Sequence, residues 1–558
     1  MSNDNQSEKK TLYNLEAIKL FLQGKDAWNA WVKANPEANV DFSGVDFSLC
    51  PLTKDLEEND FSGFEFPKGK VAFYGTKFGG GSVAFYGTKF GGGSVSFRGA
   101  QFGDGNVSFR EAQFGNGAVV FSGANFGDGD VSFRETQFGN GKVTFYQSQF
   151  GDGDVDFREA QFGDGDASFF AAQFGDGKVT FNKARFGGGN VTFGGTQFRD
   201  GDVTFGGVQF GDGGVTFSGV QFGYGIVSFF AAQFGEGRVS FDKTQFRDGD
   251  VTFSGARFGG GDVSFMDAQF GDGILDFSKV ELKRGRIDFL PTKCGPGKIG
   301  FCSVNFDGDI VFNPADVSEA AAIDFSGAKI EGALSIGNVE TNCVVDLRLS
   351  SIKHSIDIDN PKIGFKKEHI ENGYEPIVYR HLALLPYRRA AKHDAPSCFR
   401  RLKKLAKDAE NHEKMLDFFA KEIQSDYGRG ITGSTLTMFL LYDYLSDYGR
   451  SIKRPALGLA AFTVIYALLY SMLSVAGQGD LADFWGGLAP AMTLSIAHTL
   501  PFNFGSRFAS ADVINYLYGE SSYSWINTTL HWLTISQGII GGMFLFLIGL
   551  ALRNKFRS

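Results

Sequence analysis

A 12-residue unit recurs about seventeen times between Val71 and Gly273, and it constrains the fold more than any other feature. Val95–Asn106 is a typical copy. Position 1 is nearly always Val, positions 3 and 8 are Phe, and position 11 is Gly. Position 9 is Gly except at Arg199 and Arg247. A short, strict period of this kind indicates a solenoid, in which each unit buries its apolar face against its neighbours.

Each unit contains two inward-facing pairs. Val at position 1 and Phe at position 3 flank a Ser or Thr, which is the alternation of a half-buried strand. A small residue at position 6 and Phe at position 8 repeat the pattern, and the Gly-x-Gly that follows can take positive φ at a corner. We expect two units per coil, which gives a rod of about 40 Å; one unit per coil would give roughly twice that length. The sequence leaves both arrangements open.

The small-x-Phe pairs, five residues apart, resemble those of pentapeptide-repeat proteins. The resemblance implies an all-β, right-handed β-helix. The two additional residues of the Gly-x-Gly corner are a departure from the family pattern. Irregular pairs begin at Val40, and degenerate pairs such as Ile287-Asp-Phe289 continue beyond Gly273 and fade near Ile363. We therefore predict that the β-helix occupies residues 39–364.

Residues 1–38 are predicted to form a polar tail and one amphipathic helix that covers the open end of the solenoid. The helix is expected over about 12–35, because apolar residues recur there at helical spacing. An uncovered strand edge would invite aggregation, which favours a capping role over the alternative of a partner-binding helix. The apolar side of this helix is expected to consist of Leu15, Ile18, Leu22, Trp28 and Trp31.

The surface of the predicted solenoid suggests binding more than catalysis. Asp is common at position 10, as at Asp104 and Asp128, but the spacing differs from that of the calcium-binding nonapeptide repeat, so solvated turn carboxylates are favoured over a calcium site. Pentapeptide rods that mimic DNA and bind topoisomerase are a family precedent. Basic residues such as Arg98 and Arg110 interrupt the acidic rows and weaken that reading. We expect a scaffold with a cytoplasmic protein partner on the β-helix.

Composition and motifs exclude several functions. The net charge of −9 gives no reason to expect a nucleic-acid partner. The five Cys form no CxxC, which indicates reduced thiols in the cytoplasm, and the N-terminal residues predict no secretory signal. The seven His form no HExxH, and the sequence contains neither a nucleophile elbow nor a phosphate-binding loop. We therefore expect no enzymatic activity, no cofactor and no metal.

Residues 365–447 are predicted to form a helical linker. Two apolar stripes at helical spacing indicate a hairpin that turns near Asn411, with Ser397 as the N-cap of its first helix. The segment resembles the one that precedes the membrane domain in bacterial pentapeptide-repeat membrane proteins. A coupling element and a merely solvated hairpin remain open alternatives. The residues that carry the resemblance are Phe399, Arg400, Leu402, Lys403, Lys404, Leu405, Ala406, Phe418, Ala420 and Glu422.

Residues 448–558 are predicted to form a two-span membrane domain. Two uncharged runs, at about 456–475 and 533–552, are long enough to cross the lipid bilayer. Cations lie outside both runs on one side, whereas the loop between them has Arg507 as its only Lys or Arg. The positive-inside rule then places both termini in the cytoplasm. The resemblance to bacterial pentapeptide-repeat membrane proteins implies that the spans lie in a bacterial inner membrane. The flanking cations are Arg450, Lys453, Arg454, Arg553, Lys555 and Arg557.

The loop between the spans contains an apolar segment, about 488–500, that is too short to cross and is predicted to be re-entrant. This order of elements resembles the two-helix potassium-channel family, which implies a pore helix and, by analogy, a tetramer. The family's Thr-Val-Gly-Tyr-Gly filter is missing, because Pro501-Phe-Asn-Phe-Gly505 follows the segment; potassium selectivity is therefore not expected. The predicted pore-lining residues are Thr493, Ser495, Ile496, His498, Thr499, Pro501 and Asn503.

The second predicted span contains a GxxxG pair, Gly538 and Gly542, which favours close helix packing and a homo-oligomer. Together these features predict an oligomeric, ion-channel-like membrane protein with a cytoplasmic β-helical scaffold or sensor. The alternative is a membrane-anchored scaffold that conducts no ions.

Overall fold

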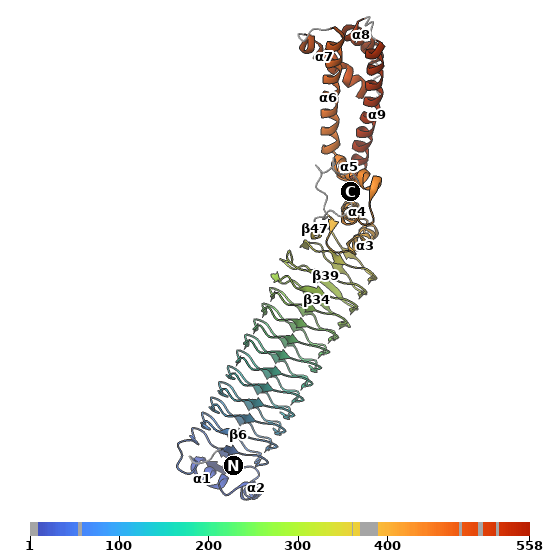
Figure 1. Cartoon of the computed structure of the whole chain (residues 1–558). Helices are drawn as coiled ribbons and strands as arrows, with labels where there is room; N and C mark the ends of the chain where they lie inside the picture. The colour runs from blue at the N-terminus through green and yellow to red at the C-terminus, as the bar shows by residue number, and fades with distance from the viewer. Residues whose placement is uncertain are drawn as a thin grey trace, which may run out of the picture. The chain divides into compact units, whose positions relative to one another are not determined.

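A computed structural model describes residues 9–53, 58–359, 361–368, 389–478, 483–499, 506–519 and 524–557. The chain divides into two compact units, Met1–Phe365 and Lys366–Ser558. The first unit is a parallel β-solenoid, and the second consists mainly of helices (Figure 1). Each unit is described by itself below.

The coils of the solenoid contain two 12-residue units each. Val71 pairs in parallel with Val95, and Val83 pairs with Val107, so that hydrogen-bonded partners are 24 residues apart. Alternate copies of the unit therefore join two different sheets, of 15 and 13 strands. The expectation of two units per coil is confirmed, and the coil of one unit is excluded.

The strands of both long sheets are short, and most have two residues. The 15-stranded sheet contains β1 (Thr11–Tyr13), β2 (Asn39–Asp41), β5 (Val71–Ala72), β8 (Val95–Ser96), β10 (Val119–Val120), β12 (Val143–Thr144), β15 (Ala167–Ser168), β19 (Val191–Thr192), β22 (Val215–Thr216), β26 (Val239–Ser240), β30 (Val263–Ser264), β34 (Arg286–Phe289), β38 (Asp309–Phe312), β41 (Leu334–Ser335) and β45 (Ile356–Asp357). The 13-stranded sheet contains β3 (Glu58–Asp60), β6 (Ser82–Ala84), β9 (Val107–Ser108), β11 (Val131–Ser132), β13 (Val155–Asp156), β17 (Val179–Thr180), β21 (Val203–Thr204), β24 (Val227–Ser228), β28 (Val251–Thr252), β32 (Leu275–Asp276), β36 (Lys298–Gly300), β39 (Ala322–Asp324) and β43 (Val345–Asp346).

Shorter sheets form where positions 7 and 8 of successive coils pair. Two of them have six strands, one from β16 (Gln173–Phe174) to β35 (Lys293–Cys294) and the other from β25 (Gln233–Phe234) to β44 (Ser351–Ile352). Every pairing within these two sheets is parallel.

The core of the solenoid consists of columns of buried Phe rings. Phe85 and Phe109, both at position 3, stack with ring centroids 4.8 Å apart and planes at 1°. Across the core, Phe97 meets Phe109 edge to face at 5.3 Å and 80°. Both geometries are favourable for aromatic pairs. A buried hydroxyl at position 6 is also satisfied, because Thr136 Oγ1 donates to the Phe109 carbonyl at 2.7 Å.

Glycine is required at position 11 by close approach between coils. A Cβ on Gly117 would overlap the carbonyl of Gly93 and lie 2.6 Å from the backbone nitrogen of Ser94. Gly117 does not have a positive φ; positive φ occurs instead at position 5, where Gly99 (65°) and Glu111 (58°) both adopt it. The prediction that Gly-x-Gly supplies positive φ is therefore wrong for position 11, but it is confirmed at position 9 of some copies, including Gly103 (77°) and Gly127 (66°).

The carboxylates in the corners bind the neighbouring coil. At position 12, Asp130 Oδ1 accepts the backbone N–H of Asp154 at 2.9 Å, and at position 10 Asp152 Oδ1 accepts that of Asp176 at 3.1 Å. These rows thus satisfy backbone donors that the corners would otherwise expose to solvent. This role supports the interpretation of the acidic rows as turn carboxylates.

The N-terminal cap is built from two helices, α1 (Asn14–Phe21) and α2 (Lys25–Ala34), so the prediction of one continuous helix is wrong. The chain breaks at Gly24, whose φ of +91° a helix does not allow. Trp28 is fully buried, stacks on Phe42 at 6.0 Å, and donates through Nε1 to the Glu65 carbonyl at 2.7 Å. Ile18 is also buried. Two further residues of the expected apolar side, Leu15 and Leu22, are exposed.

The second unit begins with β47 (Lys367–Glu368) and β48 (Arg389–Ala390), which pair antiparallel. The predicted hairpin is confirmed as α3 (Ala395–Asp408) and α4 (His412–Ser425). Arg400 Nε donates to Glu422 Oε1 across it at 2.8 Å. Asn411 caps α4 by accepting from the N–H of Lys414. Ser397 is not the N-cap of α3: it lies inside the helix, and its hydroxyl donates to the carbonyl of Asp394, which occupies the cap.

In the described part of the unit five further helices follow: α5 (Gly433–Ser446), α6 (Lys453–Gln478), α7 (Asp483–Thr499), α8 (Ser506–Tyr518) and α9 (Ser524–Lys555). Two of them, α6 and α9, contain segments long and apolar enough to cross a membrane, each with a mean hydropathy of 2.0. They pack side by side, and α7 and α8 lie near the C-terminal end of α6 (Figure 1). The sequence analysis did not predict α8.

The close approach between coils predicts that one added methyl group at position 11 lowers the stability of the solenoid. Gly117→Ala should destabilise the solenoid by about 1–3 kcal/mol, because the colliding atoms belong to backbone that is fixed by its own hydrogen bonds. The thermal midpoint of the solenoid's circular-dichroism signal should therefore fall. The matched control is Gly92→Ala, since a Cβ at Gly92 meets nothing within 4 Å. Equal midpoints for the two variants would contradict this explanation.

Candidate functional site

The helix α7 is the centre of the candidate site, and a shared core holds it against α6, α8 and α9. Tyr470 and Leu473 of α6, Leu494 of α7 and Ile526 of α9 belong to this core. All four are buried. The core fixes one face of α7 by apolar packing, and its remaining members are Tyr466, Ala491, Leu517, Tyr518 and Leu530.

A buried network of hydrogen-bonded side chains fixes the orientation of α7 within this packing. Gln537 of α9 is fully buried, and its two Nε2 hydrogens are shared among three acceptors, Ser495 Oγ at 2.7 Å, the Ser495 carbonyl at 2.9 Å and Thr499 Oγ1 at 2.8 Å. Its Oε1 accepts from the Tyr470 hydroxyl at 2.7 Å. Ser495 Oγ donates in turn to the Thr463 carbonyl of α6 at 2.7 Å. One amide side chain thereby links α6, α7 and α9.

Two further hydroxyl groups of α6 form hydrogen bonds with the ends of α7 and α8. Ser471 Oγ of α6 donates to the Phe484 carbonyl in the first turn of α7 at 2.7 Å. Ser474 Oγ donates to the Leu517 carbonyl of α8 at 2.5 Å. The Leu517 carbonyl lies in the last turn of α8, where carbonyl groups lack a partner inside the helix, so the Ser474 hydroxyl satisfies it. The helix α7 is thus hydrogen-bonded to α6 near both of its ends.

The predicted pore-lining residues do not share one environment. Thr493 and Ile496 are exposed on the face of α7 that the bundle leaves uncovered, together with Trp485 and Ala489. Ser495 and Thr499 are buried in the network around Gln537 and face the interior of the bundle. His498 is partly buried. Pro501 and Asn503 lie outside the described residues.

The GxxxG glycines of α9 face away from the bundle. A Cβ on Gly538 or Gly542 would meet nothing within 4 Å. Among these glycines of α9, the close approach occurs at Gly541, where a Cβ would lie 3.0 Å from the Thr499 carbonyl oxygen. Sequence reasoning missed Gly541, because the motif by itself does not show which glycine faces the neighbouring helix. Packing of Gly538 and Gly542 against a second copy stays a prediction.

A second cluster lies at the joint between α5 and α6. Asp447, Tyr448 and Gly449 have consecutive positive φ values of 50°, 54° and 78°. A bulky residue such as Tyr rarely adopts this conformation. Tyr448 is held there by burial and by a hydrogen bond between its hydroxyl and that of Tyr427. The Gly449 carbonyl accepts from Asn554 Nδ2 of α9 at 3.1 Å, so the joint also ties the ends of both long helices together.

Arg450 neutralises the acidic groups of this joint. Its Nη1 lies 2.6 Å from Asp417 Oδ1 of α4, and its Nη2 lies 2.7 Å from Asp447 Oδ1. Burial alone would lower the pKa of Arg450, but these two carboxylates raise it, so the guanidinium stays charged. Burial raises the pKa of the Tyr427 phenol to about 12 from an ordinary value that already leaves tyrosine neutral at physiological pH. The joint thus connects the hairpin helix α4 to the long helices.

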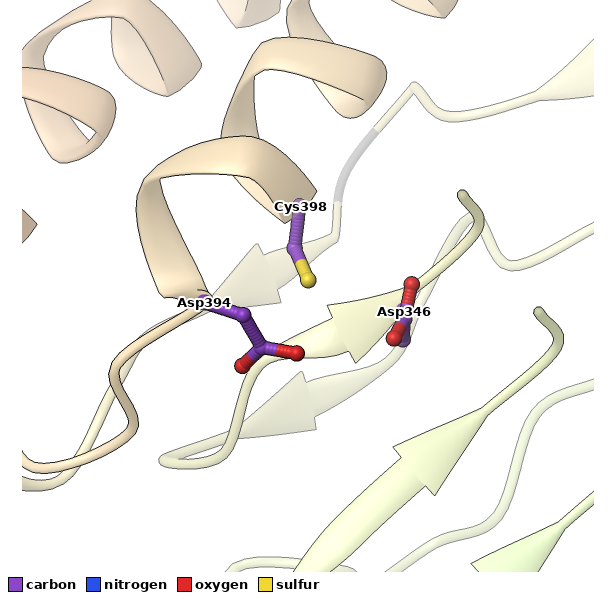
Figure 2. Close-up of side chains that lie close together, drawn as sticks. All are labelled: Asp346, Asp394 and Cys398. Atoms are coloured by element: carbon purple, nitrogen blue, oxygen red, sulfur yellow. The ribbon is translucent and has the colours of Figure 1, made fainter. Parts of the chain in front are cut away.

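Two residue types that bind metals occur at the start of α3. Asp394 is its N-cap and Cys398 is buried in its first turns. Figure 2 shows these two side chains and that of Asp346 on β43. Asp346 belongs to the first unit and pairs with Arg348 at 2.6 Å. Two ligands in one unit are fewer than the three or four that proteins use to hold zinc, so we assign no metal site to them.

Comparisons with known proteins do not assign a function to these features. No model of a protein family matches the chain, and no curated protein matches it. The similarity to pentapeptide-repeat proteins and to pore-loop channels therefore stays a resemblance in residue pattern, and function has to be argued from the site.

The network around Gln537 predicts a cost for its removal. Interhelical hydrogen bonds in membranes contribute about 0.6 kcal/mol each, so Gln537→Leu should destabilise the helical unit by on the order of 2 kcal/mol. The apolar replacement also leaves the Tyr470 hydroxyl without its acceptor. Heating the detergent-solubilised chain and measuring the fraction that stays monodisperse tests this.

Asn527→Leu is the matched control, because Asn527 is an exposed amide on the same helix. It should leave the midpoint of heat-induced aggregation unchanged. A similar loss of thermal stability in both variants would contradict this prediction. It would mean that replacing any polar residue of α9 is destabilising, whether or not it belongs to the network.

Proposed function

We propose that the second unit is an integral membrane domain in which α6 and α9 cross the lipid bilayer. Both helices are long and apolar enough to do so. Exposed Trp525 and Trp532 lie toward the N-terminal end of α9, and Trp485 lies in the first turn of α7, whereas cations occupy the other ends of α6 and α9. Trp residues at a membrane interface and an excess of Lys and Arg on the cytoplasmic side are both typical of membrane spans.

The cations set the proposed orientation. Lys453 and Arg454 begin α6, and Arg553 and Lys555 lie in the last turn of α9. By the positive-inside rule these ends face the cytoplasm, which also places both termini and the solenoid there. The resemblance to bacterial pentapeptide-repeat membrane proteins supports a bacterial inner membrane for this proposal.

We propose further that several copies assemble into an ion-conducting pore around α7. The observation that carries this is the position of α7, an apolar helix fixed between α6 and α9 by Gln537 while its opposite face stays uncovered. Four copies would follow the resemblance to two-helix channels. Thr493 and Ile496 would then face the pore, and Ser495 and Thr499 would position α7. No particular ion is proposed, because the potassium-channel filter sequence is missing.

A second candidate function is a membrane-anchored scaffold. The described polar side chains between α7 and α9 bind one another, and Thr493 is the one hydroxyl on the uncovered face of α7 among the described residues. A surface of this kind suits helix packing or lipid as well as a hydrophobic constriction. In this reading the solenoid binds a cytoplasmic protein and the helices only hold it at the membrane. Neither function includes catalysis.

Thiol modification in planar bilayers distinguishes the two functions. Reconstituted wild-type chains should pass current, and Thr493→Cys chains should lose most of it after a charged thiol reagent is added, because the added group would narrow the pore. Ile465→Cys is the control, since Ile465 is exposed on α6 away from the proposed pore.

Current that is unaffected in both variants would contradict the assignment of Thr493 to the pore. Purified oligomers that never conduct would establish the anchor. Wild-type chains treated with the same reagent serve as the control for modification of the native cysteines.

A further inference from the structure

The ends of α6 and α9 present cations at one level of the helical unit. Lys453 and Arg454 lie in the first turn of α6, and Arg553 and Arg557 lie in or just after the last turn of α9. The hydrogen bond from Asn554 Nδ2 to the carbonyl of Gly449 joins these two ends directly. Because each cation is at most about five residues from Gly449 or Asn554 along the chain, the four residues lie at the same end of the bundle.

These cations differ from Arg450 in their surroundings. Arg450 is enclosed by the carboxylates of Asp417 and Asp447, which use its charge inside the protein. Lys453, Arg553 and Arg557 are exposed, and none of them forms an ion pair with another described residue. Their charge is therefore available to an external anion.

Arg454 is partly engaged but still exposed. Its Nη1 donates to the main-chain carbonyl of Asp443 at 3.0 Å, and it makes no ion pair with the described carboxylates. A guanidinium has five N–H donors, so most of them remain free to bind a phosphate. The contact orients the group, and the carboxylate of Asp443 interacts with it electrostatically without forming an ion pair.

Exposed apolar side chains accompany the cations. Phe556, between Lys555 and Arg557, has 86% of its surface exposed, and Leu457, one turn after Lys453, has 71% exposed. Cations on long stems beside exposed apolar groups are typical of side chains that reach the headgroup layer from the hydrocarbon boundary. A soluble anion or a nucleic acid would offer nothing to cover Phe556 and Leu457.

We propose that Lys453, Arg454, Arg553 and Arg557 bind the phosphate groups of acidic phospholipids. The acyl chains of the same lipids would lie along the exposed apolar surfaces of α6 and α9, next to Leu457 and Phe556. Arginine suits this role because its planar fork can bind two phosphate oxygens at once. The inference rests on the proposed membrane-spanning function, and it adds a lipid class and the residues that recognise it.

Lipid retention by the full chain tests the proposal. The chain is reconstituted into vesicles of phosphatidylcholine with a minor fraction of phosphatidylglycerol, extracted in mild detergent, and its retained lipids are quantified by mass spectrometry. The wild type should retain phosphatidylglycerol in preference to phosphatidylcholine. The triple variant Lys453→Gln, Arg553→Gln, Arg557→Gln should lose about tenfold or more of that preference, since each juxtamembrane cation contributes to anionic-lipid binding.

The matched control is a triple variant that changes the net charge of the chain by the same amount, but in the solenoid. Lys142→Gln, Arg185→Gln and Arg238→Gln remove three exposed cations of the solenoid that form no ion pair with described residues. This variant should retain phosphatidylglycerol like the wild type. Excess inorganic phosphate in the extraction buffer should not displace the lipid; displacement by phosphate would identify a general anion site and overturn the lipid assignment.

The remaining outcomes separate this inference from the proposed function. Equal lipid retention by the two triple variants, or no preference by the wild type, would overturn the inference alone, provided that carbonate extraction leaves the chain in the vesicles. A chain that carbonate releases from the vesicles would overturn the membrane assignment and the lipid site together.

Discussion

The solenoid depends on the stacking of phenylalanine rings along its axis. Phe97 and Phe121 lie 4.9 Å apart and nearly parallel, a distance close to the spacing of hydrogen-bonded strands. Ring stacking and backbone pairing therefore have the same repeat distance, and neither has to distort for the other. The tight glycine corners and the buried hydroxyl of Thr136 follow from this spacing. Coils that lie so close leave no room for a Cβ at Gly117, and they bring a Thr hydroxyl at position 6 within hydrogen-bond distance of a carbonyl of the previous coil.

Much of this architecture can be predicted from the sequence, because a strict repeat states the inward positions directly. The number of units per coil cannot, since both alternatives place Val71 and Phe73 inside. It is fixed by long-range pairing, as between Val71 and Val95. The reason for each glycine is also hidden: Gly117 and Gly99 look alike in the sequence, yet one avoids a collision and the other has a positive φ. The break at Gly24 was detectable, because glycine within a helical pattern is a signal of helix termination.

The helical unit was less predictable, because its site depends on contacts between helices far apart in the sequence. The length and hydropathy of α6 and α9 indicate spans, but not that Gln537 binds Ser495 and Thr499. A signal was present, since Gln537 is a polar amide within an apolar run, and such residues in spans usually have a partner. The opposite exposures of Ser495 and Ile496, which are neighbours in the chain, follow only from the orientation of α7.

The alternation of repeat copies between two sheets has a consequence for how the solenoid could change in length. Duplication of a whole coil would add one layer and leave every later residue on its original side. Duplication of a single 12-residue copy would preserve the packing equally well, yet it would move all subsequent copies to the opposite sheet. Everything beyond the insertion would then be turned by about half a revolution about the axis. The packing of the core would tolerate both kinds of duplication. Only the single-copy duplication would disturb a ligand that binds residues on one side of the solenoid.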